Sequence, residues 1–349
     1  MKNVLLISHR NESYYFEPFV AACERKGIQM LVLDPSLFPQ HATLSITVDQ
    51  HGGRHGSIDV LTWGTSSVYK ATVAAADISA AWSLRDSVVR DTDDSSVEAR
   101  FRGSETDAAL KMFLSILPCP WVNRKQDVSF LTSNKLYQQV VAAECGLTVP
   151  LTLVSNDPSA VTAFSDSARW LLLKSMGYVR LDNAGRYFLY SERFSHEELT
   201  TEQDAIRACP IFAQEYVEKR YEYRVMAIGN RILSCRIDSQ ASEQTKVDWR
   251  HYDLENVAHI QVDLPRHVNE KILHFMQRVN LQYGAIDLIE TPEGDFVFLE
   301  INPSGQWGWI ADLAGLPIAD AVADMLDELI HLRASGSDQS RSERVASSC

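Results

Sequence analysis

The first 33 residues alternate between apolar runs and a helical stretch, and this pattern restricts the fold more than any other part of the sequence. An apolar run at residues 4–8 precedes a helix predicted over residues 14–26, and Gly27 follows in the position of a residue that ends a helix. A second apolar run covers residues 29–33 and ends in Asp34-Pro35. Strand, helix and strand in this order form a right-handed βαβ unit, so the chain is predicted to contain a parallel sheet.

Length and charge limit the possible classes of protein. A chain of 349 residues is long enough for two or three domains. Acidic residues outnumber basic ones, 46 against 33, for a formal net charge of −13. This charge argues against a nucleic-acid binder and against a polybasic protein of membrane surfaces, because both need clustered lysine and arginine.

Export and membrane signals are not found in the sequence. The N-terminal apolar run is too short for a signal peptide, and no window approaches the ~18 apolar residues of a spanning helix. The six cysteines are scattered, without a C-x-x-C pair, and are expected to be free thiols. We therefore expect a cytoplasmic protein.

Periodicity and turn residues predict the further elements of the chain. Strands are expected at residues 44–49, 58–63, 78–82, 151–155, 170–174, 187–191, 211–217, 223–228, 231–237, 283–290 and 295–301. Helices are expected at residues 106–117, 133–145 and 267–280, and from Pro317 to about residue 332. In the helix at 133–145 the apolar residues Leu136, Val140, Val141 and Ala143 recur at helical spacing.

The strand pair at residues 283–301 carries the most informative polar residues. With a four-residue loop at 291–294, Asp287 lies opposite Phe298, and Glu300 and Asn302 share its face of the hairpin. Two carboxylates and an amide on one face suit Mg²⁺, which prefers oxygen ligands. A five-residue loop would reverse the parity and separate these side chains. The alternative is that the carboxylates only decorate an exposed hairpin.

Cations and a nucleotide-reading segment precede this hairpin. Lys135 lies in the first turn of the helix at 133–145, and Lys174 ends an apolar strand, where either lysine could contact phosphate. Residues 214–217 lead from a strand toward Glu222, so backbone groups of the segment could read an adenine and Glu222 could accept from ribose hydroxyls. Solvated charges on an amphipathic strand pair remain the alternative.

Read in order, these segments resemble the ATP-grasp ligases. The resemblance implies that Lys135 and Lys174 contact the phosphates of ATP, that Gln214, Glu215, Tyr216 and Val217 line the adenine site, that Glu222 holds the ribose, and that Asp287, Glu300 and Asn302 hold two Mg²⁺ ions. It also implies an α/β (α+β) ATP-grasp fold. The expected domains are a Rossmann-like pre-ATP-grasp domain at 1–120, a central lid subdomain at 121–213, a C-terminal subdomain with the Mg²⁺ site at 214–332, and a disordered tail at 333–349.

A finer motif narrows the resemblance to one subgroup. Residues 300–310, with Gly305-Gln306-Trp307, resemble the microviridin-type or graspetide maturases of ribosomally made peptides, as do segments at 121–123, 146–150, 155–158, 238–240 and 248–250. One departure is the stretch at 81–85, where the subgroup tends to have Trp-Tyr-Arg-Arg. The resemblance covers roughly residues 3–331.

This subgroup implies an enzyme that activates Asp or Glu side chains of a precursor peptide as acyl phosphates and joins them to Ser, Thr or Lys side chains. Its partner is a leader-plus-core peptide, and a homodimer is implied. Arg224, Arg236 and Arg250 are the candidate catalytic residues, with surface salt bridges as the alternative for each. Two other functions stay open: a RimK-like ligase that adds a free amino acid, and a nucleotide-binding regulatory module without turnover.

Overall fold

The structure is a computed structural model that describes residues 2–9, 16–84, 96–168, 170–176, 192–247 and 256–346. The chain divides into two compact units, one of residues 1–125 with 317–349 and one of residues 126–316. Within the described ranges, no helix is both long enough and apolar enough to cross a lipid bilayer.

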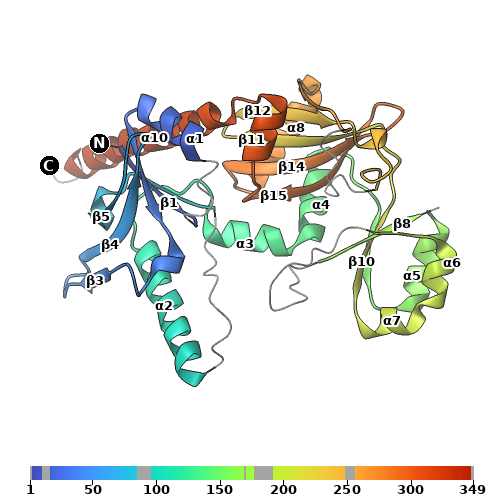
Figure 1. The fold of residues 1–349 in the computed structure, drawn as a ribbon, viewed down its shortest axis with the longest axis horizontal. Helices are drawn as coiled ribbons and strands as arrows, with labels where there is room; N and C mark the ends of the chain where they lie inside the picture. The colour runs from blue at the N-terminus through green and yellow to red at the C-terminus, as the bar shows by residue number, and fades with distance from the viewer. Residues whose placement is uncertain are drawn as a thin grey trace. The chain divides into compact units, whose positions relative to one another are not determined.

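The first unit is a six-stranded mixed sheet with helices on both faces (Figure 1). Its strands are β1 (Lys2–Ile7), β2 (Ile28–Leu33), β3 (Leu44–Val48), β4 (Arg54–Trp63), β5 (Val68–Ala74) and β6 (Ala80–Ser83), and its helices are α1 (Phe16–Arg25), α2 (Val97–Ser115) and α10 (Ile318–Ala346). The strand order is β3-β4-β2-β1-β6, and β5 pairs with β4. The predicted parallel arrangement is confirmed for β1, β2 and β6, whereas β3, β4 and β5 are antiparallel.

Apolar residues on both faces of β1 explain the layering of this unit. Leu5 and Ile7 join a buried cluster with Phe113 of α2. On another part of the unit, Phe19 of α1 meets Trp82 of β6 edge to face. A central strand buried on both sides is typical of parallel sheets covered by helices.

Helix α10 packs against α1 and is part of this unit, although the sequence grouped its first residues with the C-terminal subdomain (Figure 1). Its buried Val322 and Leu326 are the reason. The helical backbone continues to Ala346, into the segment at 333–349 for which the sequence predicted a disordered tail. No proline interrupts the chain there.

The second unit contains two antiparallel sheets. The four-stranded sheet has the order β7-β10-β8-β9 and is built from β7 (Thr152–Ser155), β8 (Leu171–Lys174), β9 (Glu192–Phe194) and β10 (Ile211–Glu215). Helices α5 (Pro158–Asp166), α6 (His196–Thr201) and α7 (Gln203–Ala208) accompany it. The predicted strand at 187–191 lies outside the described residues.

The five-stranded sheet has the order β13-β12-β11-β14-β15. Its strands are β11 (Tyr221–Ile228), β12 (Arg231–Ile237), β13 (His259–Val262), β14 (Tyr283–Glu290) and β15 (Phe296–Asn302), and the helices of this part are α3 (Lys125–Ser133), α4 (Lys135–Glu144), α8 (Arg266–Arg278) and α9 (Gly308–Ala314). One face of the sheet packs on α8 and α4 through a core that includes Val225, Ile286, Phe298 and Phe275. The strands predicted at 223–228 and 231–237 pair antiparallel as a hairpin, and the hairpin predicted at 283–301 is confirmed. The division of this unit into a lid and a C-terminal subdomain stays a prediction.

Candidate active site

Strands β14 and β15 bring two carboxylates together, but in a register that differs from the predicted one. Residues 291–295 form a five-residue connection, with Glu290 opposite Phe296 and Leu288 opposite Phe298. The predicted four-residue loop and the pairing of Asp287 with Phe298 are therefore wrong. A β-bulge then shifts the register between Asp287 and Leu288, so that Glu300 lies directly opposite Asp287.

The hydrophobic core explains the bulge. Phe298 and Ile301 are both buried in the cluster below the sheet, although they are three residues apart. In a regular strand these residues would face opposite sides, because side chains alternate. One extra residue, Leu299, lets both enter the core and turns Glu300 to the face of Asp287. The extra loop residue reverses the side of the sheet that each residue of β15 faces, and the bulge reverses it again, so Glu300 still faces the same side as Asp287.

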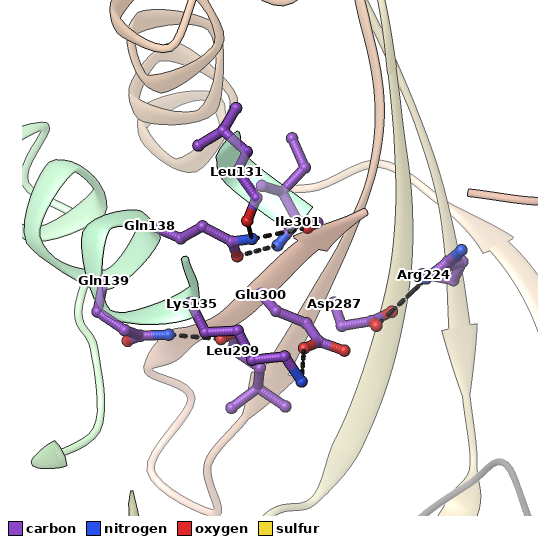
Figure 2. Close-up of polar contacts among 9 residues, drawn as sticks. All are labelled: Leu131, Lys135, Gln138, Gln139, Arg224, Asp287, Leu299, Glu300 and Ile301. Carbon is purple, nitrogen blue, oxygen red and sulfur yellow. Dashed lines mark hydrogen bonds and ion pairs between the residues drawn. The ribbon is translucent and has the colours of Figure 1, made fainter. Parts of the chain in front are cut away.

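Helix α4 supplies the first cation of the site. The side chain of Asn134 caps the helix by accepting from the amide of Tyr137 at 3.0 Å. Lys135 is the first helical residue, and its Nζ lies 3.1 Å from Glu300 Oε2 (Figure 2). The predicted apolar pattern does not describe the buried face of this helix, because Leu136 and Val140 are exposed while Gln138 and Gln139 are buried.

Arg224 of β11 supplies a second cation. It lies opposite Asp287 in the ladder, and its Nη1 is 3.0 Å and 3.2 Å from the two carboxylate oxygens (Figure 2). The side chains are 8% and 14% exposed. The Nε of Arg224 is buried and has no hydrogen-bond partner among the described residues. The guanidinium group therefore retains hydrogen-bonding capacity.

Gly305, from the motif at 300–310, makes room for Arg224. A Cβ at this position would lie 2.8 Å from Arg224 Nη2 and 2.4 Å from Ala285 Cβ. The loop is fixed by bonds from Gly305 N to Asn302 O at 3.1 Å and from the hydroxyl of Tyr283 to Gly305 O at 2.5 Å. Only glycine fits here without displacing a neighbour.

A third ion pair joins Lys219 and Glu222, 2.7 Å apart with both side chains 6% exposed. Lys219 also donates to the carbonyl of Val247 at 2.9 Å. Lys219 is not among the residues predicted for the site, because it stands in the charged run Glu218-Lys219-Arg220, which is typical of solvated loops. The only local signal is its position three residues before Glu222, the predicted ribose ligand.

Residues of all three pairs line one cleft within the second unit, to which the Arg224–Asp287 pair contributes Asp287. It is lined by Lys135, Pro150, Leu172, Lys174, Gln214, Glu215, Tyr216, Val217, Lys219, Glu222, Val247, Asp287, Ile289, Leu299 and Glu300. Every residue predicted for ATP binding is in this set, as are two of the three predicted metal ligands. Asn302 is not, although it faces the same side as Glu300; its Oδ1 accepts from the amide of Ser304 at 3.1 Å.

The four-stranded sheet contributes one wall of the cleft. Lys174 ends β8 opposite Phe212 of β10, and the buried Gln214 donates to the hydroxyl of Thr152 at 2.9 Å. The amide N–H of Glu215 is bonded to Leu151 O at 3.0 Å. This N–H is one of the backbone groups predicted to contact the edge of an adenine, but it already donates a hydrogen bond within the fold.

Arg236 is not brought to the cleft. It pairs with Tyr223 across β11 and β12, so its side chain lies on the opposite face of the sheet from Arg224. There its guanidinium stacks on the ring of Tyr221 at 4.3 Å. On the same face, burial first and then the hydrogen bond to Glu290 raise the pKa of Tyr223 above its ordinary range. This position does not support the predicted catalytic role of Arg236. Side chains alternate between the two faces along a strand, and this alternation places Arg236 on the face away from Arg224 and the cleft. Arg250 lies outside the described residues.

The residues of the site fit a magnesium ion by their chemistry. Asp287 and Glu300 lie opposite one another on neighbouring strands, and Asn302 follows two residues later on the same face. All donors are oxygen atoms, which is the preference of Mg²⁺. Among the described residues, no group of three or more His, Cys, Asp or Glu side chains is placed to hold a metal ion.

Comparison with known proteins identifies the fold. No family model and no curated protein sequence matches the chain. Among solved structures, the RiPP-associated ATP-grasp ligase of Chryseobacterium gregarium, in complex with ADP and a leader and core peptide, aligns with a TM-score of 0.82 at 24% identity over 94% of this chain and 97% of that one. The macrocyclase MdnC of Microcystis aeruginosa MRC, bound with precursor peptide MdnA, aligns with a TM-score of 0.75 at 24% identity over 93% and 99% of the two chains. The macrocyclase MdnB of the same organism gives 0.74 at 27% identity over 93% and 99%.

The fold is therefore that of the ATP-grasp ligases, which confirms the α/β architecture that the resemblance implied. Of these three similar structures, one is a RiPP-associated ATP-grasp ligase and two are macrocyclases, one of them bound with a precursor peptide, in agreement with the resemblance of residues 300–310.

Proposed function

We propose that the chain is an ATP-dependent macrocyclase of a ribosomally made precursor peptide. In this reaction a side-chain carboxylate of the peptide attacks the γ-phosphorus of ATP, forming an acyl phosphate and releasing ADP. A Ser or Thr hydroxyl or a Lys amine of the same peptide then attacks the acyl carbon and loses its proton, and phosphate leaves. The product is an ester or amide ring.

The observation that carries this proposal is the set of three cation–carboxylate pairs around one cleft: Lys135–Glu300, Arg224–Asp287 and Lys219–Glu222. Two of these pairs are largely buried, and such charges need a partner because desolvation is costly. A nucleotide with its metal carries both signs of charge and can exchange partners with the pairs. Phosphate oxygens would take the cations, and Asp287 and Glu300 would be freed as ligands.

The nucleotide would be held by residues already gathered at the cleft. We assign Lys135 and Lys174 to the phosphates and Glu222 to the ribose, with Lys219 orienting the carboxylate of Glu222. The apolar side chains of Leu172, Val217 and Ile289 supply walls for an adenine ring. Because the N–H of Glu215 is engaged, the carbonyl of Glu215 and the N–H of Val217 are the groups assigned to the edge of the base.

Asp287, Glu300 and Asn302 would hold Mg²⁺, which neutralises negative charge on the phosphate groups when it is bound. We retain two ions as the expected number. Lys135, Lys174 and Arg224 offset the charge that develops on the transferring group, and a single such donor typically contributes a factor of about 10² to 10³ in rate. A cleft closed against water would protect the acyl phosphate from hydrolysis.

The test is to incubate the protein with ATP, Mg²⁺ and the candidate precursor peptide encoded beside its gene, and to measure peptide mass and ADP. Products lighter by one water for each ring are expected. Unchanged peptide mass with normal ATP binding would contradict the proposal. A gain in mass equal to an added amino acid would support the RimK-like alternative instead, and nucleotide binding without ADP release would support the regulatory module. The homodimer and the cytoplasmic location stay predictions.

A further inference from the structure

We propose that Gln138 and Gln139 are positioning residues that hold the bulge of β15 and thereby keep Glu300 opposite Asp287. The proposal rests on the proposed function, because it treats Glu300 as a ligand of the nucleotide-associated metal. It assigns to two amides of α4 a role that no local feature of the sequence indicates.

The first observation is that β15 lies at the edge of its sheet. The backbone groups on the outer side of an edge strand have no neighbouring strand to bond. In addition, a bulge interrupts the regular ladder on the inner side at Leu299. On this outer side the amide of Phe298 donates to the carbonyl of Thr148 at 2.8 Å, just before the bulge. The backbone from Leu299 to Ile301 lies beyond that bond and needs further partners to fix which residue occupies the bulge.

Helix α4 supplies those partners through two adjacent side chains (Figure 2). Gln138 accepts from the amide N–H of Ile301 at 2.9 Å and donates to the carbonyl of Ile301 at 3.1 Å. Gln139 donates to the carbonyl of Leu299. The bonds therefore grip the residues immediately before and after Glu300. An amide suits this task because it offers a donor and an acceptor, as a strand's peptide group does.

The helix itself is tied to the same point. Gln138 also donates to the carbonyl of Leu131 at 2.8 Å, in the preceding helix. Lys135, Gln138 and Gln139 lie at positions i, i+3 and i+4, which share one face of a helix. From this face Lys135 reaches the carboxylate of Glu300 while the two amides hold its backbone.

The second observation is a polar group that stability alone does not account for. Gln138 and Gln139 are 2% and 4% exposed, and Gln139 Oε1 is buried without a hydrogen-bond partner among the described residues. A buried polar atom without a partner is unfavourable for folding. An apolar residue of similar size would avoid this cost, so the position of Gln139 is better explained by what its Nε2 holds.

The experiment compares the full-length protein with Gln138→Met, Gln139→Met and the double variant, which keep side-chain volume but lose the bonds. Val141→Ala is the matched control, since Val141 is buried in the core on the same helix and does not line the cleft. Mn²⁺ binding to the ADP complex is measured by electron paramagnetic resonance, and ADP binding without metal by calorimetry.

In the double variant Mn²⁺ binding is expected to weaken at least tenfold, while ADP binding without metal changes less than twofold. Val141→Ala should lower the Tm but leave both affinities unchanged. Hydrogen exchange of residues 296–302 should become faster in Gln138→Met and in the double variant but not in Val141→Ala, because the amide of Ile301 loses its acceptor Gln138.

A folded double variant with unchanged Mn²⁺ affinity would overturn the proposal. If the double variant does not fold, Mn²⁺ binding by the folded Gln139→Met variant is measured instead. This variant loses one bond and also removes the unpartnered oxygen, so an unchanged Mn²⁺ affinity in it would overturn the proposal. Failure of the proposed function gives a different result: the wild-type protein would then release no ring product, whatever the variants do to Mn²⁺ binding. If wild-type protein binds no Mn²⁺ with ADP, the exchange of residues 296–302 alone decides whether the amides hold the bulge.

Discussion

At the scale of single residues, the two ion pairs that flank the proposed metal site differ in how deeply they are buried. Arg224 and Asp287 are nearly covered, whereas the side chains of Lys135 and Glu300 are 24% and 25% exposed. A buried charge that loses its partner is destabilising, but a partly solvated one is stabilised by water. The same loss of a carboxylate should therefore affect folding differently at the two positions.

We predict that Asp287→Asn and Glu300→Gln each reduce ADP release at least 100-fold, or about 2.7 kcal/mol in activation free energy. Asp287→Asn should also lower the free energy of unfolding by about 3 kcal/mol, because Arg224 stays buried without a counter-charge. Glu300→Gln should cost about 1 kcal/mol or less. Urea denaturation measures both.

Glu290→Gln is the control for these variants. Glu290 lies on β14, bonds to Tyr223 on the opposite face of the sheet, and does not line the cleft. Full activity in this variant is expected. ADP release that survives Glu300→Gln would show that the assignment of Glu300 to the metal is wrong.

Steric fit at Gly305 leads to a second prediction. Gly305→Ala should lower stability by about 1–3 kcal/mol and reduce activity, because the added Cβ would overlap Ala285 and press on Arg224. The double variant Ala285→Gly with Gly305→Ala removes the tighter overlap, so part of the stability should return. A double-mutant cycle from denaturation curves measures the coupling, and simple additivity of the two changes would contradict the contact.

At the scale of elements, helix α4 shows what the spacing of apolar residues can predict and what it cannot. The sequence correctly predicts a helix near residues 133–145, and its cap and the glycine after it are local signals. It does not predict which side is buried, since Leu136 and Val140 are exposed and two glutamines face the protein. The reason is tertiary: this face lies along an edge strand, where backbone groups need hydrogen bonds more than apolar contact.

The cap of α4 should matter for nucleotide binding as well as for stability. Asn134→Ala is expected to lower the free energy of unfolding by about 1 kcal/mol and to raise the KM for ATP, because fraying of the first turn moves Lys135. Asp157→Ala is a matched control, since Asp157 caps α5 by accepting from the amide of Ser159 at 3.0 Å and does not line the cleft.

Both variants should show a similar loss in thermal denaturation, and only Asn134→Ala should change the kinetics. Equal KM values in the two variants would mean that Lys135 does not depend on the cap.

At the scale of the whole molecule, the two ends of the chain form one unit. Buried Ile318, Val322 and Leu326 of α10 complete the core on the side of α1, and Lys2 contacts Asp327 at 2.5 Å. A contiguous division of the sequence at residue 214 cannot show this, because the partners are about 300 residues apart along the chain. Arg25, for example, pairs with Asp320, which lies 295 positions later in the sequence.

We predict that a chain ending at Leu316 loses the fold of the first unit, since the apolar surface under α10 would face water. Limited proteolysis should then digest residues 1–125 rapidly and leave the second unit resistant. A chain ending at Leu332, a residue 70% exposed, should keep the Tm of the full protein. Equal protease resistance of the two truncated chains would contradict this role of α10.

The sequence by itself determined the types and order of the candidate site residues and most of the elements that carry them. The local patterns are a lysine after a helix cap, a lysine after an apolar strand, a strand that leads to Glu222, and a hairpin with acidic residues. Local physical chemistry is enough to recognise them. The structure alone decided their geometry. Whether Glu300 faces Asp287 depends on parity, and a five-residue loop would have turned it away had Phe298 and Ile301 not both been drawn into one core through the bulge at Leu299. The opposite faces of Arg224 and Arg236 follow from the same alternation. Parity depends on how strands pair and pack, which is a property of the assembled sheet, and so no reading of one segment could settle it.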